Sequence, residues 1–180
     1  KEYNMETACI QYNYFIQAAT ASGDEKYHVK EFYRVRYAGG QNYLLNFERS
    51  MESIFDPHKA SSKSNQLKLG ITEDNKQKML TNKKENKLYF ARGGNLYEYD
   101  MSACTIKTIF SAFSGNASYD YRAYDEQAIR LLKIDDKDNL YFCAYGYFPR
   151  GRYEGDVAVV LFEYTADGQL EEMVYMPMNT

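Results

Sequence analysis

Hydrophobic and polar residues alternate with a period of two along several stretches of this chain. Residues 10–16 carry isoleucine or tyrosine at every even position, and residues 33–37 alternate tyrosine or valine with arginine. This period is typical of half-buried strands. Glycine pairs at 39–40 and 93–94 separate such runs, and they suit two-residue hairpin turns because both turn positions need positive φ. The pattern therefore predicts antiparallel hairpins around each glycine pair.

Further strands are predicted at 128–134, 139–142 and 157–162. The last of these is nearly continuous in apolar residues, which is expected of a strand buried on both faces. Small and polar residues predict turns at 18–24 and 135–138. Residues 57–66 are almost free of large apolar side chains and are expected to form an exposed connector.

Three segments resemble one another, at 42–55, 95–110 and 160–174. Each has a Tyr- or Phe-rich strand, a polar turn, and a second β-branched or apolar run. A repeat of roughly 50 to 65 residues is typical of β-propeller blades. We therefore expect a single all-β domain over 1–180, built of antiparallel hairpins in blade-like repeats at about 30–56, 67–110 and 128–176.

A closed propeller has about four to eight blades. Either a degenerate fourth blade lies in residues 1–30, or the chain forms an open or partial propeller. The composition supports the β class, since 19 Tyr and 10 Phe suit the pleated surface of a sheet.

Charge and hydropathy exclude two classes of partner. The net charge is −3, with 22 basic and 25 acidic residues interspersed, so no basic stripe is available to neutralise nucleic-acid phosphates. No apolar run reaches the roughly 18 residues that a membrane-spanning helix needs. We expect neither nucleic-acid binding nor a membrane span in this segment. The sequence leaves the oligomeric state open.

The sequence favours neither a metal site nor a cofactor. Cys9, Cys104 and Cys143 lack zinc-ligand spacing and are expected to be buried, reduced thiols, with one disulfide and one leftover cysteine as the alternative. His28 and His58 are expected on the solvated surface. The acidic run at 135–139 resembles part of a calcium loop, but it lacks the required glycine and glutamate. A plain β-turn is the favoured interpretation of that run.

The segment at 150–156, which we call the tip, is the best candidate for a binding surface. It interrupts two strongly apolar strands with glycines and charges, and Arg and Tyr are enriched at interface hot spots. The alternative is that its charges pair locally. A second candidate is an aromatic platform of Tyr119, Tyr121 and Tyr124, against ordinary core packing. The predicted ligand-binding residues are Tyr145, Tyr147, Arg150, Arg152, Tyr153 and Glu154.

Catalytic motifs are absent from the sequence, including the nucleophile elbow, the P-loop and the metalloprotease helix. No catalytic residue is predicted, although a carboxylate pair brought together from separate loops stays open.

Two patches carry a resemblance to a known group of proteins. The first patch comprises residues 86–90 and 95–100. The second comprises residues 145–157, with Tyr-Gly-Tyr at 145–147 and a charged residue followed by glycine at 150–151 and again at 154–155. In these patches the chain resembles uncharacterised membrane-anchored surface proteins of Gram-positive gut bacteria, whose extracellular region is propeller-like. The resemblance implies an extracellular or cell-surface location, with an anchor outside this segment. It transfers no activity.

The expected function is a non-enzymatic binding or scaffold module that contacts a protein, a peptide or a cell-wall saccharide. The alternatives are a carboxylate-based hydrolase or lyase domain, and a regulatory ectodomain that modulates a membrane kinase.

Overall fold

The structure is a computed structural model that describes residues 2–3, 7–21, 23–60, 62–63, 66–70, 78–112, 127–148 and 151–178. Within these ranges the chain forms antiparallel strands and turns and contains no helix. The predicted all-β class is confirmed. The strands fall into two compact units, one containing β1–β4 and the other β5–β14.

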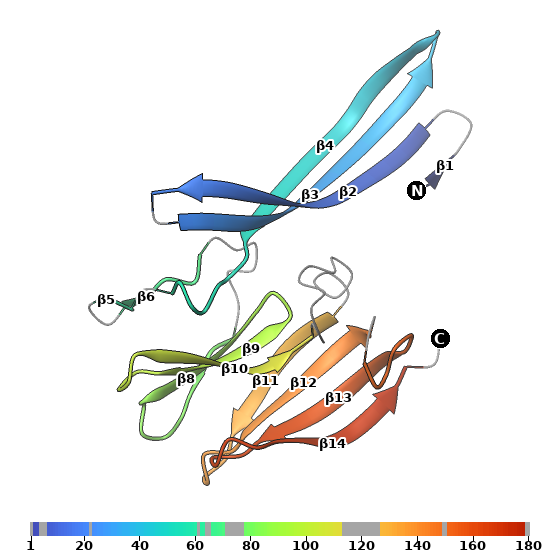
Figure 1. Cartoon of the computed structure of the whole chain (residues 1–180). Helices are drawn as coiled ribbons and strands as arrows, with labels where there is room; N and C mark the ends of the chain where they lie inside the picture. The colour runs from blue at the N-terminus through green and yellow to red at the C-terminus, as the bar shows by residue number, and fades with distance from the viewer. Residues whose placement is uncertain are drawn as a thin grey trace. The chain divides into compact units, whose positions relative to one another are not determined.

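The first unit is a four-stranded meander in the order β1-β2-β3-β4 (Figure 1, blue to cyan). Its strands are β1 (Glu2–Tyr3), β2 (Thr7–Thr20), β3 (Gly23–Ala38) and β4 (Gln41–Ser53). Gly39 and Gly40 have φ of 59° and 80°, which confirms the predicted hairpin turn between β3 and β4. The turn predicted at 18–24 is shorter than expected, because the ladder continues until Thr20 pairs with Gly23.

One prediction for this half of the chain is wrong, and one of the two alternatives left open for residues 1–30 is excluded. Residues 41–53 form one continuous strand rather than a strand, a turn and a second strand, because residues 46–53 pair without interruption with β3. Residues 7–20 do not form a separate fourth blade either. They pair with β3 over their whole length and so belong to the same sheet.

The second unit contains two further four-stranded meanders, in the orders β10-β9-β8-β7 and β11-β12-β13-β14, and a short β5–β6 ladder (Figure 1). The first meander consists of β7 (Leu80–Thr81), β8 (Lys87–Arg92), β9 (Asn95–Asp100) and β10 (Thr105–Ser111). The second consists of β11 (Gln127–Ile134), β12 (Leu140–Tyr147), β13 (Val157–Tyr164) and β14 (Leu170–Pro177). The short ladder, β5 (Ser62–Lys63) with β6 (Gln66–Leu67), lies in the predicted connector.

The same type of turn recurs in both meanders. In the turns that begin at Asn82, Asp135 and Thr165, the N–H of the fourth residue donates to the carbonyl of the first, at 2.9, 3.1 and 2.8 Å respectively. That fourth residue has positive φ in each case, at Glu85, Asp138 and Gly168. Asn, Asp and Thr favour such turns because their side chains bond the backbone that follows. The meanders differ at their other end, where Gly93 and Gly94 join β8 to β9, whereas a much longer connection joins β12 to β13.

One hydrophobic core joins the two meanders of the second unit. Phe142 is fully buried, and its ring lies 5.2 Å from that of Phe162 and 5.7 Å from that of Phe110 on β10. The fully or nearly fully buried members of this cluster come from both sheets: Tyr89, Ala91, Leu96, Leu131, Leu140, Phe142 and Tyr164. On its opposite face the β7–β10 sheet is covered by Phe55, whose ring packs against Phe90 and Tyr97. This sheet is therefore buried on both sides.

Candidate binding surfaces

The tip lies between β12 and β13 and closes as an extended hairpin. Phe148 N–H donates to the Asp156 carbonyl, and Gly155 N–H donates to the Phe148 carbonyl, both at 2.8 Å. Arg150 lies outside the described residues. Tyr145 is exposed and Tyr147 is half-buried. Both predicted site residues belong to strand β12, which precedes the tip, and not to the tip itself.

Tyr153 folds the tip back onto β14. Its ring stacks on Tyr175 with centroids 4.0 Å apart and an 8° interplanar angle, and its hydroxyl donates to the Glu172 carboxylate. Arg152 forms a 3.7 Å ion pair with the same glutamate and lies over the Tyr153 ring. Arg152 and Glu154 remain exposed. The tip thus presents an exposed Arg152 side chain paired with Glu172, while Tyr153 is used in packing.

The first unit carries a surface that the sequence did not identify as a site, which we call the aromatic face. The register of β2, β3 and β4 aligns Ile10 with Tyr33 and Phe47 in one row, and Tyr12 with Glu31 and Arg49 in the next. Further rows place Tyr14 beside Val29 and Met51, and Ile16 beside Tyr27. Tyr12 and Phe47 are 53% and 42% exposed. Large hydrophobic side chains therefore reach solvent on β2 and β4, on both sides of the more buried central strand β3.

Glu31 is the polar centre of the aromatic face. Its side chain is nearly buried, and it accepts hydrogen bonds from the hydroxyls of Tyr14 and Tyr33, both at 2.8 Å. Arg49 Nε donates to the same carboxylate at 2.7 Å. These donors, first of all Tyr14, lower the pKa of Glu31. The contacts fix the two tyrosines and hold Arg49, which is still half-exposed, in one orientation.

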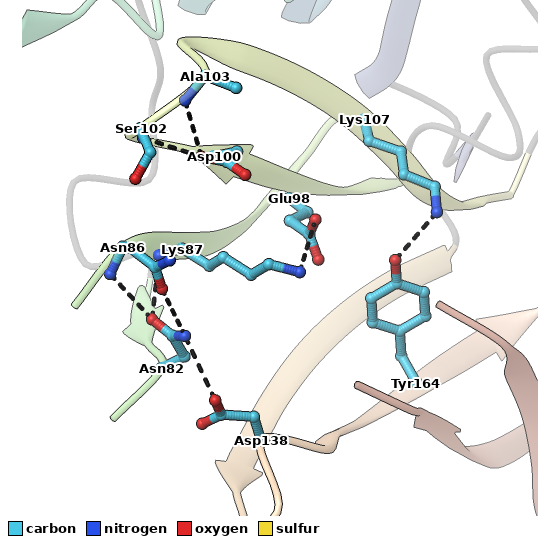
Figure 2. A network of polar contacts seen from close by, with 10 residues as sticks. All are labelled: Asn82, Asn86, Lys87, Glu98, Asp100, Ser102, Ala103, Lys107, Asp138 and Tyr164. Carbon is cyan, nitrogen blue, oxygen red and sulfur yellow. Dashed lines mark hydrogen bonds and ion pairs between the residues drawn. The ribbon is translucent and has the colours of Figure 1, made fainter. Parts of the chain in front are cut away.

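A second polar network joins the turn ends of the two meanders in the second unit (Figure 2). The Asn82 side chain accepts from the backbone N–H groups of Asn86 and Lys87, both at 3.0 Å, and its amide points toward Asp138 at 3.5 Å. Lys87 pairs with Glu98 at 3.3 Å, and Lys107 donates to the Tyr164 hydroxyl at 3.1 Å. The contacts of Asn82 with Asp138 and of Lys107 with Tyr164 link the two sheets, so we interpret this network as structural.

The outer face of the β11–β14 sheet, which points away from the shared core, is unusually apolar. It includes Val157, Val159, Leu161, Val174 and Met176, and Met176 is 47% exposed. The prediction that residues 157–162 are buried on both faces is therefore wrong in part, because Ala158 and Val160 are buried whereas Val157 is exposed. A shallow hollow of ≈ 700 Å³ opens on this face, and its lining includes Arg130, Tyr141, Cys143, Leu161 and Met173.

Two further candidates from the sequence were the aromatic platform and the acidic run at 135–139. Tyr119, Tyr121 and Tyr124 lie outside the described residues. The run at 135–139 is a turn, as predicted: the Asp135 carboxylate accepts the N–H groups of Lys137 and Asn139, both at 2.9 Å, and these bonds, first that from Asn139, lower the pKa of Asp135.

Two predictions about single residues need correction. His28 is 1% exposed rather than solvated, because it lies on the central strand β3 and packs against the Phe15 ring at 5.2 Å; His58 is exposed. The three cysteines are free thiols, but only Cys143 is buried. Cys104 is exposed in the turn after β9, where its φ is 53°.

Comparisons with protein-family models, with curated proteins and with solved structures found no match to this chain. In the ranges that the structure describes, no helix is long and apolar enough to cross a membrane.

Proposed function

We propose that this chain is a non-enzymatic binding module of the propeller-like extracellular region of a bacterial surface protein, and that it binds a protein or peptide through the aromatic face. The resemblance of residues 86–100 and 145–157 to such surface proteins supports the location. The two matching meanders of the second unit, packed face to face with like turns, support a propeller-like arrangement.

The aromatic face carries the functional part of the proposal. Contiguous exposed apolar surface on a folded domain marks an interaction site, and this surface combines exposed Tyr12, Phe47 and Met51 with a held arginine. Tyr and Arg dominate interface hot spots because they combine contact area with directed hydrogen bonds. Arg49 is held by Glu31 in advance, so binding costs less side-chain entropy than ordering a free arginine would.

A protein or peptide fits this surface better than a saccharide. The face extends over three strands of 13 to 16 residues, and aliphatic side chains such as Ile16 and Met51 alternate with its rings. A sugar site needs polar groups around each stacking ring, whereas the polar groups of Glu31 and Tyr14 are already bonded to one another.

The test is a selection of phage-displayed dodecapeptides on the immobilised chain, followed by sequencing and titration of enriched peptides. We expect a family of peptides that binds the wild type and loses at least tenfold in affinity to Phe47→Ser. Asn46→Ser is the matched control, since Asn46 is the neighbouring exposed residue on the opposite face of β4.

Absence of enrichment, or equal binding of enriched peptides by the wild type and Phe47→Ser, would contradict the proposal. Titration with chitooligosaccharides and muropeptides in the same format provides the saccharide arm. Binding there that depends on Phe47, without peptide enrichment, would reassign the partner.

A further inference from the structure

The outer face of the β11–β14 sheet divides into an apolar region and a charged row. Two registered rows of the largely apolar region are Ala128, Tyr145, Val159 and Met176, and Arg130, Cys143, Leu161 and Val174, in which the exposed Arg130 at the β11 edge is the charged member. Nearest the Asp135 turn, a third row crosses the sheet in the order Lys133, Tyr141, Glu163 and Glu171. The face is thus apolar over most of its length, with a base at the β11 side and acids at the β13–β14 side.

The sequence of β13 is typical of a strand whose outer face is also covered by other protein. Residues 157–162 are apolar at every position, as in strands with both faces buried. Yet the outward Val157, and Val174 opposite Leu161 on β14, are each more than 40% exposed. The β7–β10 sheet in the same unit does have both faces covered. A packed sheet is the kind of cover that this unit already uses on its inner side.

The charged row indicates which sheet would fit. Glu163 and Glu171 lie directly opposite each other in the β13–β14 ladder, an arrangement that is unfavourable for like charges. Glu163 accepts a 2.7 Å hydrogen bond from Tyr141, and that bond is the main cause that raises the pKa of Tyr141 to about 12. Among the described residues, no cation forms an ion pair with Glu171, while Lys133 at the other end of the row lies 5.0 Å above the Tyr141 ring and has no carboxylate partner.

We propose that the outer face of the β11–β14 sheet binds the same face of a second copy of this chain. A two-fold axis parallel to the strands and between the two sheets reverses the strand order, so that β11 of one copy lies over β14 of the other. Each charged row then meets its own reverse, and Lys133 of each copy faces Glu171 of the other. Aligned sheets pack in this manner with a separation of about 10 Å, and the contact is isologous, as closed dimers require.

The size of the face predicts a weak dimer. Strands of 8 residues are about 26 Å long, and four strands are about 19 Å wide, which gives a footprint on the order of 500 Å² per copy. Interfaces of this size belong to the transient class, so association is expected at micromolar or higher concentration.

The experiment is sedimentation velocity on the full chain from about 5 to 500 μM, with two charge reversals. Lys133→Glu and Glu171→Lys should each weaken dimerisation at least tenfold, because each places like charges at both symmetry-related contacts. An equimolar mixture of the two variants should dimerise again, since both contacts of the heterodimer then join opposite charges. Both side chains are exposed, and circular dichroism of each variant checks the fold.

Lys137→Glu is the matched control, because Lys137 is an exposed lysine of the adjacent turn that lies outside the sheet face; this variant should dimerise like the wild type. A wild type that is monomeric at 500 μM overturns the proposal and leaves the face to a different sheet. Dimerisation that ignores the charge reversals, or a mixture that stays monomeric, overturns it as well. Phe47→Ser should leave dimerisation unchanged, so failure here is distinguishable from failure of the peptide-binding proposal.

Discussion

Arg49 and Glu31 face each other across the β3–β4 ladder, with Arg49 Nε donating to Glu31 Oε1 at 2.7 Å. The two residues are 18 positions apart in the chain, and the same carboxylate also accepts from Tyr14 on β2 and from Tyr33, two residues along β3. A single acidic side chain therefore orients three residues of the aromatic face. This arrangement makes the stability of the first unit depend on the ionisation of Glu31.

The first prediction concerns pH. Hydrogen bonds from Tyr14 and Tyr33 lower the pKa of Glu31 in the folded chain below its ordinary value of 4.5. A lowered folded-state pKa means that the carboxylate stabilises the fold above about pH 4.5, and that this contribution is lost as the pH falls through the lowered value. Urea unfolding of the wild type and Glu31→Gln should show a larger difference in unfolding free energy at pH 7 than at pH 3. An equal difference at both pH values would contradict this assignment.

The second prediction concerns the turn between β7 and β8. Glu85 is exposed and has a φ of 53°, a region that costs an L-residue free energy and glycine little. Glu85→Gly should raise the unfolding free energy by roughly 0.5–1 kcal/mol, measured by urea denaturation. Glu85→Ala is the control, because alanine retains the cost of positive φ and should bring no gain. A stabilisation by alanine as large as that by glycine would point to the charge instead of the backbone.

The local features of the fold could be predicted from the sequence, because their causes lie within a few residues. Gly93 and Gly94 produce a hairpin turn wherever two strands flank them, and Asp135 bonds the N–H groups two and four residues later. The turn expected near Ser50 is absent, and the cause is again local. No residue there favours positive φ, and the strand simply continues along β3.

The candidate sites could be predicted only in part, because they depend on register between strands. Alternation placed residues 10–16 on one side of a strand, yet nothing local shows that Glu31 and Arg49 complete that surface. The burial of His28 depends on the same register, which sets it beside Phe15. Conversely, the tip was visible as a polar interruption, whereas the return of Tyr153 onto Tyr175 links residues on two different elements.

The third prediction concerns the cysteines. The Cys104 thiol is exposed in a turn, whereas Cys143 is 9% exposed on β12, and burial raises the pKa of its thiol. Because the thiolate is the reactive species, iodoacetamide should modify Cys104 in the native chain and Cys143 only after unfolding. Peptide mass mapping locates the label, and Cys104→Ser should remove the fast reaction. Rapid native labelling of Cys143 would show that the β11–β14 sheet opens readily.

The fourth prediction concerns the core that joins the two meanders of the second unit. Phe142 is fully buried between Phe110 and Phe162, so Phe142→Ala removes contacts from both sheets and leaves a cavity. The expected loss of unfolding free energy is about 3–5 kcal/mol. Met101→Ala is the control, since Met101 is an exposed turn residue of the same unit, and its effect should stay within about 0.5 kcal/mol. If Phe142→Ala cost no more than Met101→Ala, the two sheets would not share a packed core. Their face-to-face stacking, which is the support for the proposed propeller-like arrangement, would then lose its physical basis.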